Sequence, residues 1–233
     1  MSSLSKTQVD QLGDRLRKGN ISDDDLRLLD AYRESFAAAY EEVVTTIRTA
    51  TGLEQLEPAG RWKTNISIIA KLVRESTMRL SRMQDIAGCR VVVEDTLKQD
   101  WVVERLIRVC QAAKVYDRRK QPSHGYRAVH VIATAQERLI EVQVRTELQH
   151  LWAQLSEELS DLFDPSIKYG GGDSDIRELL SALSDAVSAL EVWELRVGAE
   201  GLDEARRFWK QKQHERLRDM IGHIRNLKTK RGI

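Results

Sequence analysis

The sequence predicts an α+β fold, in which a mixed β-sheet is flanked by helices at both ends of the chain. Three observations lead to this expectation. Apolar residues recur at helical spacing between residues 5 and 50. Short stretches that are rich in β-branched residues or alternate in polarity follow in the centre. Strongly amphipathic segments return after residue 146.

The N-terminal region is predicted to be mainly helical. Asp23, Asp24 and Asp25 favour a helix start, because carboxylates stabilise the positive N-terminal end of a helix. The apolar residues that follow at helical spacing are Leu26, Leu29, Tyr32, Phe36, Ala39, Tyr40 and Val43. Glycine and proline indicate a break over residues 52–60. A further helix over residues 64–76 places on one face Ser67, Lys71 and Arg74.

The centre of the chain is predicted to form the sheet. The expected strands cover residues 89–93, 114–117, 126–134 and 139–145. A helix over residues 99–113 is expected to turn inward Val102, Leu106 and Val109. The last strand alternates, so that one face carries Ile140, Val142 and Val144 and the other carries Glu141, Gln143 and Arg145.

Helices are again predicted after the sheet, over residues 146–163, 175–197 and 202–228. A glycine-rich joint is expected at residues 169–173. We therefore expect three parts: an N-terminal helical segment (1–50), a core (51–165) and a C-terminal helical, basic extension (166–233). The segment 206–233 holds ten Lys or Arg residues and two acids, which suits nucleic acid or an acidic protein, or else a solvated helix.

Composition excludes several classes of protein. The 233 residues carry a formal charge of +1, so the net charge indicates no partner. Cys89 and Cys110 lack metal-ligand spacing, and two cysteines make no disulfide framework. No apolar run has the length of a signal peptide core or of a membrane span. A cytoplasmic location with no membrane association is the expectation.

Two carboxylates are the candidate catalytic groups. Asp85 precedes a core strand, and Glu141 lies on the polar face of the last strand. Such a face is either exposed to solvent or the floor of an active site. Two carboxylates at strand ends can hold Mg²⁺, or one can remove a proton from a hydroxyl. Their spacing does not separate these roles.

Cations and one aromatic residue complete the candidate site. Arg61, Lys63 and Lys71 can bind phosphates and neutralise charge in a transfer reaction, although cations of this spacing are commonly surface residues. The segment is not a Walker A loop. Tyr126 can stack on a nucleobase, or be half-buried core. His130 lies four residues on and is expected on the same strand face, within reach of a phosphate or ribose.

Four ordered motifs resemble the synthetase domain of RelA/SpoT-type alarmone synthetases, and more closely the small stand-alone synthetases. They read RxKxxxSIxxKL at residues 61–72, DIAGxR at 85–90, GYRxxH at 125–130 and ExQxRT at 141–146. The resemblance implies a nucleotidyltransferase-like mixed sheet. It also implies Mg²⁺-dependent transfer of the β,γ-pyrophosphate of ATP to a ribose 3′-hydroxyl.

Carried over by position, the resemblance implies a role for each motif residue. Asp85 is implied as the Mg²⁺ ligand, and Glu141 as the base with a share in metal binding. ATP or phosphate binding is implied for Arg61, Lys63, Ser67, Lys71, Arg90 and Arg145. Acceptor binding is implied for Tyr126, His130 and Gln143.

One departure bears on the acceptor. Alarmone-making members carry a Pro-Lys pair shortly before the Gly-Tyr, whereas this chain has Pro122-Ser123. Either Arg118, Arg119 or Lys120 compensates, or the acceptor has no 5′ phosphates to hold. The second reading resembles the toxic branch of toxin–antitoxin and phage-defence loci, whose acceptor is the 3′ end of tRNA. It implies a translation-blocking toxin and a neutralising antitoxin protein. The alternative is an alarmone synthetase acting on GDP, GTP or adenine nucleotides, and the oligomeric state stays open.

Overall fold

The computed structural model describes residues 4–52, 57–110 and 113–197, together with Gln211, Lys212, Glu215 and Asp219. The predicted helix over 202–228 and most of the basic segment therefore lie outside the described residues. The chain folds into two compact units. The first comprises Met1–Val91, Val102–Val115 and His130–Gln143, and the second comprises Val92–Trp101, Tyr116–Val129 and Val144–Ile233.

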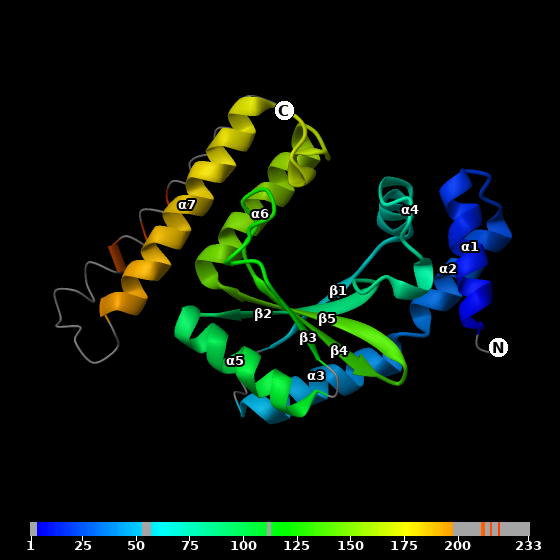
Figure 1. The fold of residues 1–233 in the computed structure, drawn as a ribbon, viewed down its shortest axis with the longest axis horizontal. Helices are drawn as coiled ribbons and strands as arrows, with labels where there is room; N and C mark the ends of the chain where they lie inside the picture. The colour runs from blue at the N-terminus through cyan, green and yellow to red at the C-terminus, as the bar shows by residue number, and fades with distance from the viewer. Residues whose placement is uncertain are drawn as a thin grey trace. The chain divides into compact units, whose positions relative to one another are not determined.

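Three helices form the N-terminal part of the first unit, as predicted (Figure 1). They are α1 (Lys6–Lys18), α2 (Asp23–Glu34) and α3 (Ala37–Thr51). Ser5 and Ser22 each close a capping box at the start of α1 and α2, which satisfies backbone N–H groups that lack partners within the helix. The apolar stripe predicted from Leu26 to Val43 is shared between two helices, because α2 ends at Glu34.

The strands form one five-stranded sheet in the order β1-β2-β5-β4-β3, which confirms the α+β class with a mixed sheet. The strands are β1 (Ala59–Trp62), β2 (Ala87–Val93), β3 (Lys114–Asp117), β4 (Val129–Ala135) and β5 (Arg138–Thr146). Strand β1 pairs antiparallel with β2. Strands β4 and β5 are joined by Gln136 and Glu137, whose φ angles of 45° and 60° are those of the turn that matches the twist of a two-residue hairpin.

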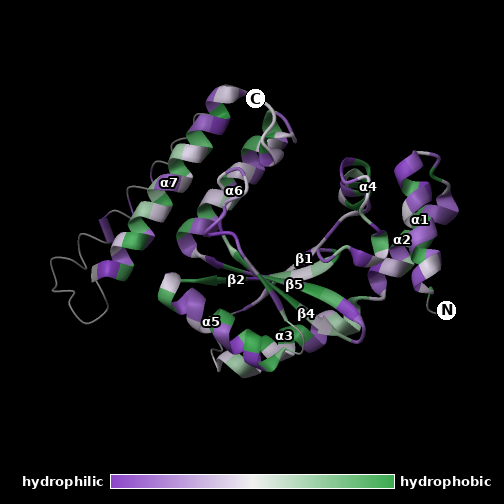
Figure 2. Cartoon of the chain, viewed as in Figure 1, coloured by the Kyte–Doolittle hydropathy of each residue, from purple (hydrophilic) through white to green (hydrophobic). Residues whose placement is uncertain are grey.

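Apolar residues concentrate on the central strands, whereas the helices alternate between apolar and polar residues (Figure 2). Between β1 and β3 the chain also forms α4 (Asn65–Arg74), η1 (Leu80–Arg82) and α5 (Thr96–Val109). Val102 and Leu106 of α5 are fully buried, as predicted. Val109 was predicted to face inward but is 45% exposed, because α5 ends at this residue.

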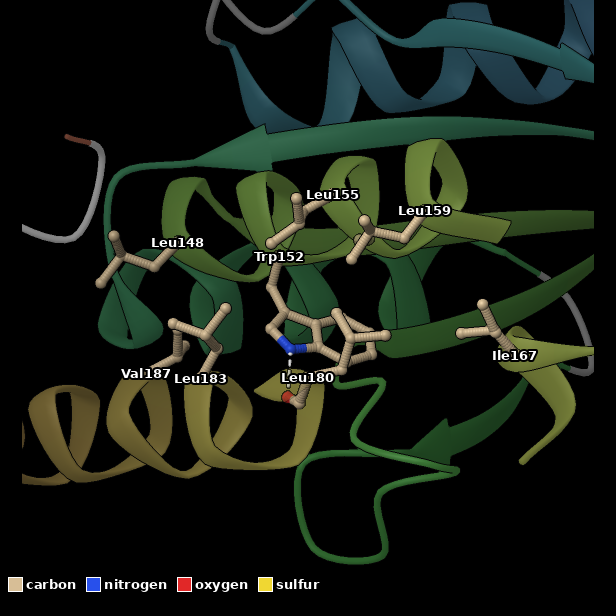
Figure 3. Close-up of a cluster of buried hydrophobic side chains, with 9 residues drawn as sticks. Leu148, Trp152, Leu155, Leu159, Ile167, Leu180, Leu183 and Val187 are labelled. Carbon is tan, nitrogen blue, oxygen red and sulfur yellow. Dashed lines mark hydrogen bonds between the residues drawn. The ribbon is translucent and has the colours of Figure 1, made fainter. Parts of the chain in front are cut away.

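Helices of the second unit pack around one tryptophan. Helices α6 (Glu147–Leu162) and α7 (Ser174–Val197) contact each other, and η2 (Ile167–Tyr169) contacts α6. Trp152 lies in their shared apolar cluster and donates its indole N–H to the carbonyl oxygen of Leu180 at 2.8 Å (Figure 3). Trp152 is buried and belongs to the core of this unit.

The predicted strand over 126–134 begins later than expected. Tyr126 lies outside β4, in a turn where Ser123 and Tyr126 form an isolated bridge. His124 and Gly125 have φ angles of 52° and 85°, so the chain curls here instead of extending. The expectation that Tyr126 and His130 share a strand face is therefore wrong.

No helix among the described residues is long and apolar enough to span a membrane.

Candidate active site

Asp85 is held between two lysines in the first unit. Its carboxylate oxygens accept hydrogen bonds from Lys63 Nζ at 3.0 Å and Lys71 Nζ at 2.9 Å. The three side chains are only 14–18% exposed. Paired charges at this depth are screened less than surface pairs. The structure thus brings together one predicted metal ligand and two predicted phosphate ligands.

Local structure explains how the two lysines converge. Lys63 follows β1, and its amide donates to the carbonyl oxygen of Ile86 at 2.9 Å. Arg33 of α2 donates to the carbonyl oxygen of Lys63 at 2.8 Å, which fixes the loop from the other side. Thr64 caps α4 by accepting from the amide of Ser67, and the helix then carries Lys71 to Asp85.

The pKa of Asp85 is lowered to about 2. Burial alone would raise it, but the charges and hydrogen bonds of Lys63 and Lys71 outweigh that effect. Asp85 is therefore ionised throughout the physiological pH range.

Glu141 is the centre of a second group in the same unit. His130 Nδ1 lies 3.0 Å from Glu141 Oε1, and Gln143 Nε2 donates to Glu141 Oε2 at 2.6 Å. Arg61 lies farther away, with Nη1 at 3.8 Å from Oε2. The Glu141 side chain is 12% exposed and Gln143 is buried, so this strand face is not a solvent-exposed surface. The interpretation as an active-site floor is favoured.

The pKa of Glu141 lies below its ordinary value. Burial raises it, as does the nearby charge of Asp85, but the hydrogen bonds from His130 and Gln143 and the charge interaction with His130 outweigh both. Glu141 is thus held as a carboxylate that can accept a proton.

A glycine lets the two carboxylates share one recess. A Cβ atom on Gly88 of β2 would lie 2.3 Å from the carbonyl oxygen of Glu141, so no other residue fits without displacing β5. The small recess beside it is lined by Arg61, Asp85, Gly88, Cys89, Glu141 and Gln143. The close packing of β2 against β5 therefore explains why the DIAGxR motif has a glycine at this position.

Two predicted phosphate ligands do not line the recess that Asp85 and Glu141 share. Ser67 is exposed in the first turn of α4, where its hydroxyl oxygen accepts from Thr64 Oγ1 at 2.9 Å. Arg90 is half-buried on β2.

Tyr126 and Arg145 lie together in the second unit. Arg145 Nη2 donates to the Tyr126 hydroxyl at 2.9 Å, and the guanidinium carbon lies 5.0 Å from the ring centroid. Arg145 is 2% exposed, so the tyrosine is held by a buried cation. Trp152 packs at a tilt against the same ring, with a centroid distance of 6.5 Å.

Helix α7 braces the turn that carries Tyr126. Ser184 Oγ donates to the carbonyl oxygen of Gly125 at 2.6 Å and accepts from Arg127 Nε at 3.0 Å. A Cβ atom on Gly125 would lie 2.8 Å from Trp152, so the turn fits closely against α6 as well. The conformation of the turn therefore depends in part on Ser184, which lies 59 positions away in the sequence.

Residues 60–160 match the family described as the region found in RelA and SpoT proteins. This segment is similar to the RelA/SpoT region. It holds all four motifs, which begin at Arg61 and end at Thr146. The predicted resemblance is confirmed.

Relatives of the RelA/SpoT region include proteins without a known role. An uncharacterized protein of Mycobacterium tuberculosis is 32% identical over 152 residues, covering 60% of this chain and 56% of that protein. An uncharacterized Mycobacterium bovis protein matches to the same extent. The chain thus spans 56% of the length of these curated relatives.

Solved structures share the fold. Small alarmone synthetase 1 of Bacillus subtilis, bound to its product pppGpp, superposes with a TM-score of 0.58 at 25% identity, covering 78% of this chain and 100% of that chain. A GTP pyrophosphokinase family protein of Streptococcus pneumoniae gives 0.57 at 22% identity, covering 83% of this chain and 98% of that chain.

The carboxylates of the matched segment suit a magnesium ion shared with substrate. Among the described residues, no group of three or more His, Cys, Asp or Glu side chains could hold a metal alone. Mg²⁺ commonly binds one or two carboxylates and completes its coordination with water and substrate phosphates. Asp85 and Glu141, which line one recess, match this donor set. Metal binding at Asp85 would require Lys63 and Lys71 to exchange that carboxylate for phosphate oxygens.

Three residues of the site were not predicted. Arg127 belongs to the GYRxxH motif, and this motif is the one sequence feature that could have indicated its role. Arg33 and Ser184 stand outside every motif, and each acts through a backbone carbonyl of a distant segment. Nothing in the local sequence of α2 or α7 indicates such a contact.

Proposed function

We propose that the chain is a pyrophosphokinase that transfers the β,γ-pyrophosphate of ATP to the 3′-hydroxyl of a ribose. One observation carries this proposal: two ionised carboxylates, Asp85 and Glu141, share a recess, and each has cations beside it. This arrangement suits phosphate transfer, in which cations stabilise charge and a base removes one proton. The RelA/SpoT region supports the same reaction.

In the proposed reaction the acceptor 3′-oxygen bonds to the β-phosphorus of ATP. The bond from that phosphorus to the α-phosphate oxygen breaks, and AMP leaves with the electron pair. Glu141 accepts the proton of the 3′-hydroxyl, while His130 and Gln143 hold its carboxylate in place. Bound Mg²⁺ would neutralise phosphate charge beside Asp85.

Lys63 and Lys71 have a second role in the proposed reaction. Lys63 and Lys71 neutralise Asp85 in the structure described here. We propose that, when ATP binds, their ammonium groups turn from Asp85 to the phosphate oxygens. Arg61, Ser67, Arg90 and Arg145 are proposed as the remaining phosphate ligands. Tyr126 is proposed to stack on the acceptor base.

We propose the 3′ end of tRNA as the preferred acceptor, which would make the protein a toxin that blocks aminoacylation. Ser123 stands where alarmone-making members have a lysine, and it is exposed. Of the nearby cations, Arg119 is already paired with Asp100 at 2.7 Å and Asp117 at 2.9 Å. This pairing makes Arg119 a poor substitute for a 5′-phosphate ligand. A neutralising antitoxin protein belongs to the same proposal.

The second candidate acceptor is a free nucleotide. It is favoured by the superposition on small alarmone synthetase 1 of B. subtilis, which was crystallised with pppGpp. Arg118 and Lys120 are exposed beside the Tyr126 turn and offer two cations for 5′ phosphates. In this case the product would be a tetra- or pentaphosphate of guanosine or adenosine.

A label-transfer assay separates the two acceptors. ATP labelled in its γ-phosphate is incubated with the protein and, separately, bulk tRNA, GDP, GTP or AMP. Label on tRNA that disappears when the 3′-terminal hydroxyl is blocked supports the tRNA acceptor. Label only in a small nucleotide supports the alarmone reaction. Label in neither, with a folded protein, contradicts the proposed function.

A further inference from the structure

An open cavity of about 860 Å³ lies in the first unit, separate from the Asp85–Glu141 recess. Its lining comes from the beginning of α1 (the helix next to the mark N in Figure 1), from η1, from the start of β3 and from the β4–β5 turn. Four cations line it: Lys6, Arg82, Lys114 and Arg138. Glu137 is the one carboxylate among the lining residues. The cavity therefore carries an excess of positive charge.

Arg138 is held in place by aromatic rings instead of by a carboxylate. Its guanidinium carbon lies 5.4 Å from the centroid of Tyr32 and 5.2 Å from that of Phe36. Both rings are buried, so the stack has a rigid support. A planar guanidinium fixed in this way keeps its N–H groups available for two-point contact with a phosphate.

Within the described part of the chain, these four cations form no ion pair with a carboxylate, since none of the four has a carboxylate oxygen within 4.0 Å. Asp10 is nearby, but it accepts from the amide of Ser81 at 3.0 Å and lies 4.0 Å from Arg79. Like charges gathered around one cavity repel each other, and an anion in the cavity would relieve that repulsion.

We propose that this cavity is a second anion site, which binds a small ligand bearing two or more linked phosphate groups. Four positive charges are more than a ligand with a single carboxylate or a single phosphate group would neutralise. The volume lies within the range of about 300–1,000 Å³ that is typical of small-molecule sites. The N-terminal end of α1 adds its positive dipole at Ser5 and Lys6. The cavity shares no lining residue with the catalytic recess.

Calorimetric titration with inorganic tripolyphosphate tests the proposal. Tripolyphosphate can also bind the catalytic lysines, so the comparison is made in a Lys71→Ala background. In that background we expect binding to persist with one ligand per chain. Adding Arg82→Ala and Lys114→Ala should weaken binding at least tenfold. Both added positions are exposed, so the fold should survive.

Controls separate this site from general attraction to a basic surface. Lys18→Ala and Lys168→Ala remove two exposed cations elsewhere and should leave the affinity unchanged. A nucleoside triphosphate should compete with tripolyphosphate at the cavity. Affinity that is unaffected by Arg82→Ala and Lys114→Ala would overturn the proposal. So would binding of a short RNA at these residues without binding of tripolyphosphate. The measurement needs no catalytic turnover, so failure of the proposed reaction would leave it interpretable.

Discussion

His130 Nδ1 lies 3.0 Å from Oε1 of Glu141, and the two side chains come from the neighbouring strands β4 and β5. Because β4 and β5 form a hairpin with a two-residue turn, the register that sets this distance is fixed locally. The pair explains how a carboxylate as buried as Glu141 stays ionised. We therefore propose that His130 positions Glu141, in addition to the acceptor binding that the resemblance implies for it.

Removal of His130 should change the pH dependence of the reaction. In His130→Ala, burial and the charge of Asp85 act on Glu141 without the opposing hydrogen bond, so the pKa of Glu141 should rise. The acidic limb of kcat/KM against pH should therefore move to higher pH. Steady-state rates from about pH 5 to 9 measure this shift. An unchanged acidic limb would show that Glu141 is not the group that must be ionised.

Asp85 should contribute stability that depends on pH. Its folded-state pKa of about 2 lies below the ordinary value of 3.8, so the contribution is complete above about pH 4 and is lost as the pH falls toward 2. Asp85→Asn should lower the free energy of unfolding at neutral pH by up to about 3–5 kcal/mol, because two lysines lose their counter-ion. Urea unfolding at neutral pH and near pH 3 measures the difference, which should shrink at the lower pH. A difference that is constant with pH would contradict the ion-pair explanation.

Ser184 should affect the acceptor without affecting ATP. Ser184→Ala removes the hydrogen bonds to Gly125 and from Arg127, so the turn that carries Tyr126 loses its brace on α7. We expect the KM for the acceptor to rise about three- to tenfold, which corresponds to a hydrogen bond of about 0.5–1.5 kcal/mol. The KM for ATP should stay the same. Ser181→Ala, at an exposed position on the same helix, is the matched control. Equal effects on both substrates would contradict a role specific to the acceptor turn.

Gly88 should tolerate no side chain. In Gly88→Ala the new Cβ atom would meet the carbonyl oxygen of Glu141, so β5 or β2 must shift. We expect a loss of about 1–3 kcal/mol in unfolding free energy, together with a large loss of activity. Thermal unfolding and the label-transfer rate measure the two effects. Wild-type activity in a fully stable variant would show that Glu141 need not hold its position.

Local patterns predicted much of the fold. Alternation placed Glu141 and Gln143 on one face of β5, and β3 covers the predicted residues. The pattern was misleading at Tyr126, because the chain turns at His124 and Gly125, which have positive φ angles, and Gly125 packs closely against Trp152. Val109 also departs from the predicted inward-facing stripe of α5, because the helix ends at this residue.

Long-range contacts account for the parts of the site that the sequence did not predict. Motif spacing indicated that Asp85, Lys63 and Lys71 act together, and the structure brings them within hydrogen-bonding distance. The contacts of Arg33 and Ser184 with backbone carbonyls depend on how distant elements pack. A backbone acceptor leaves no residue-type signal at either end, so one sequence does not reveal such pairs.

The most direct test of the central claim is to identify the nucleotide released from ATP during transfer. Pyrophosphate transfer predicts one AMP for each labelled product, and this yield should fall by about 10²–10⁴-fold in Glu141→Gln, which keeps the shape of the side chain but cannot accept the proton. Release of ADP instead of AMP, or an AMP yield that is unchanged in Glu141→Gln, would contradict the account.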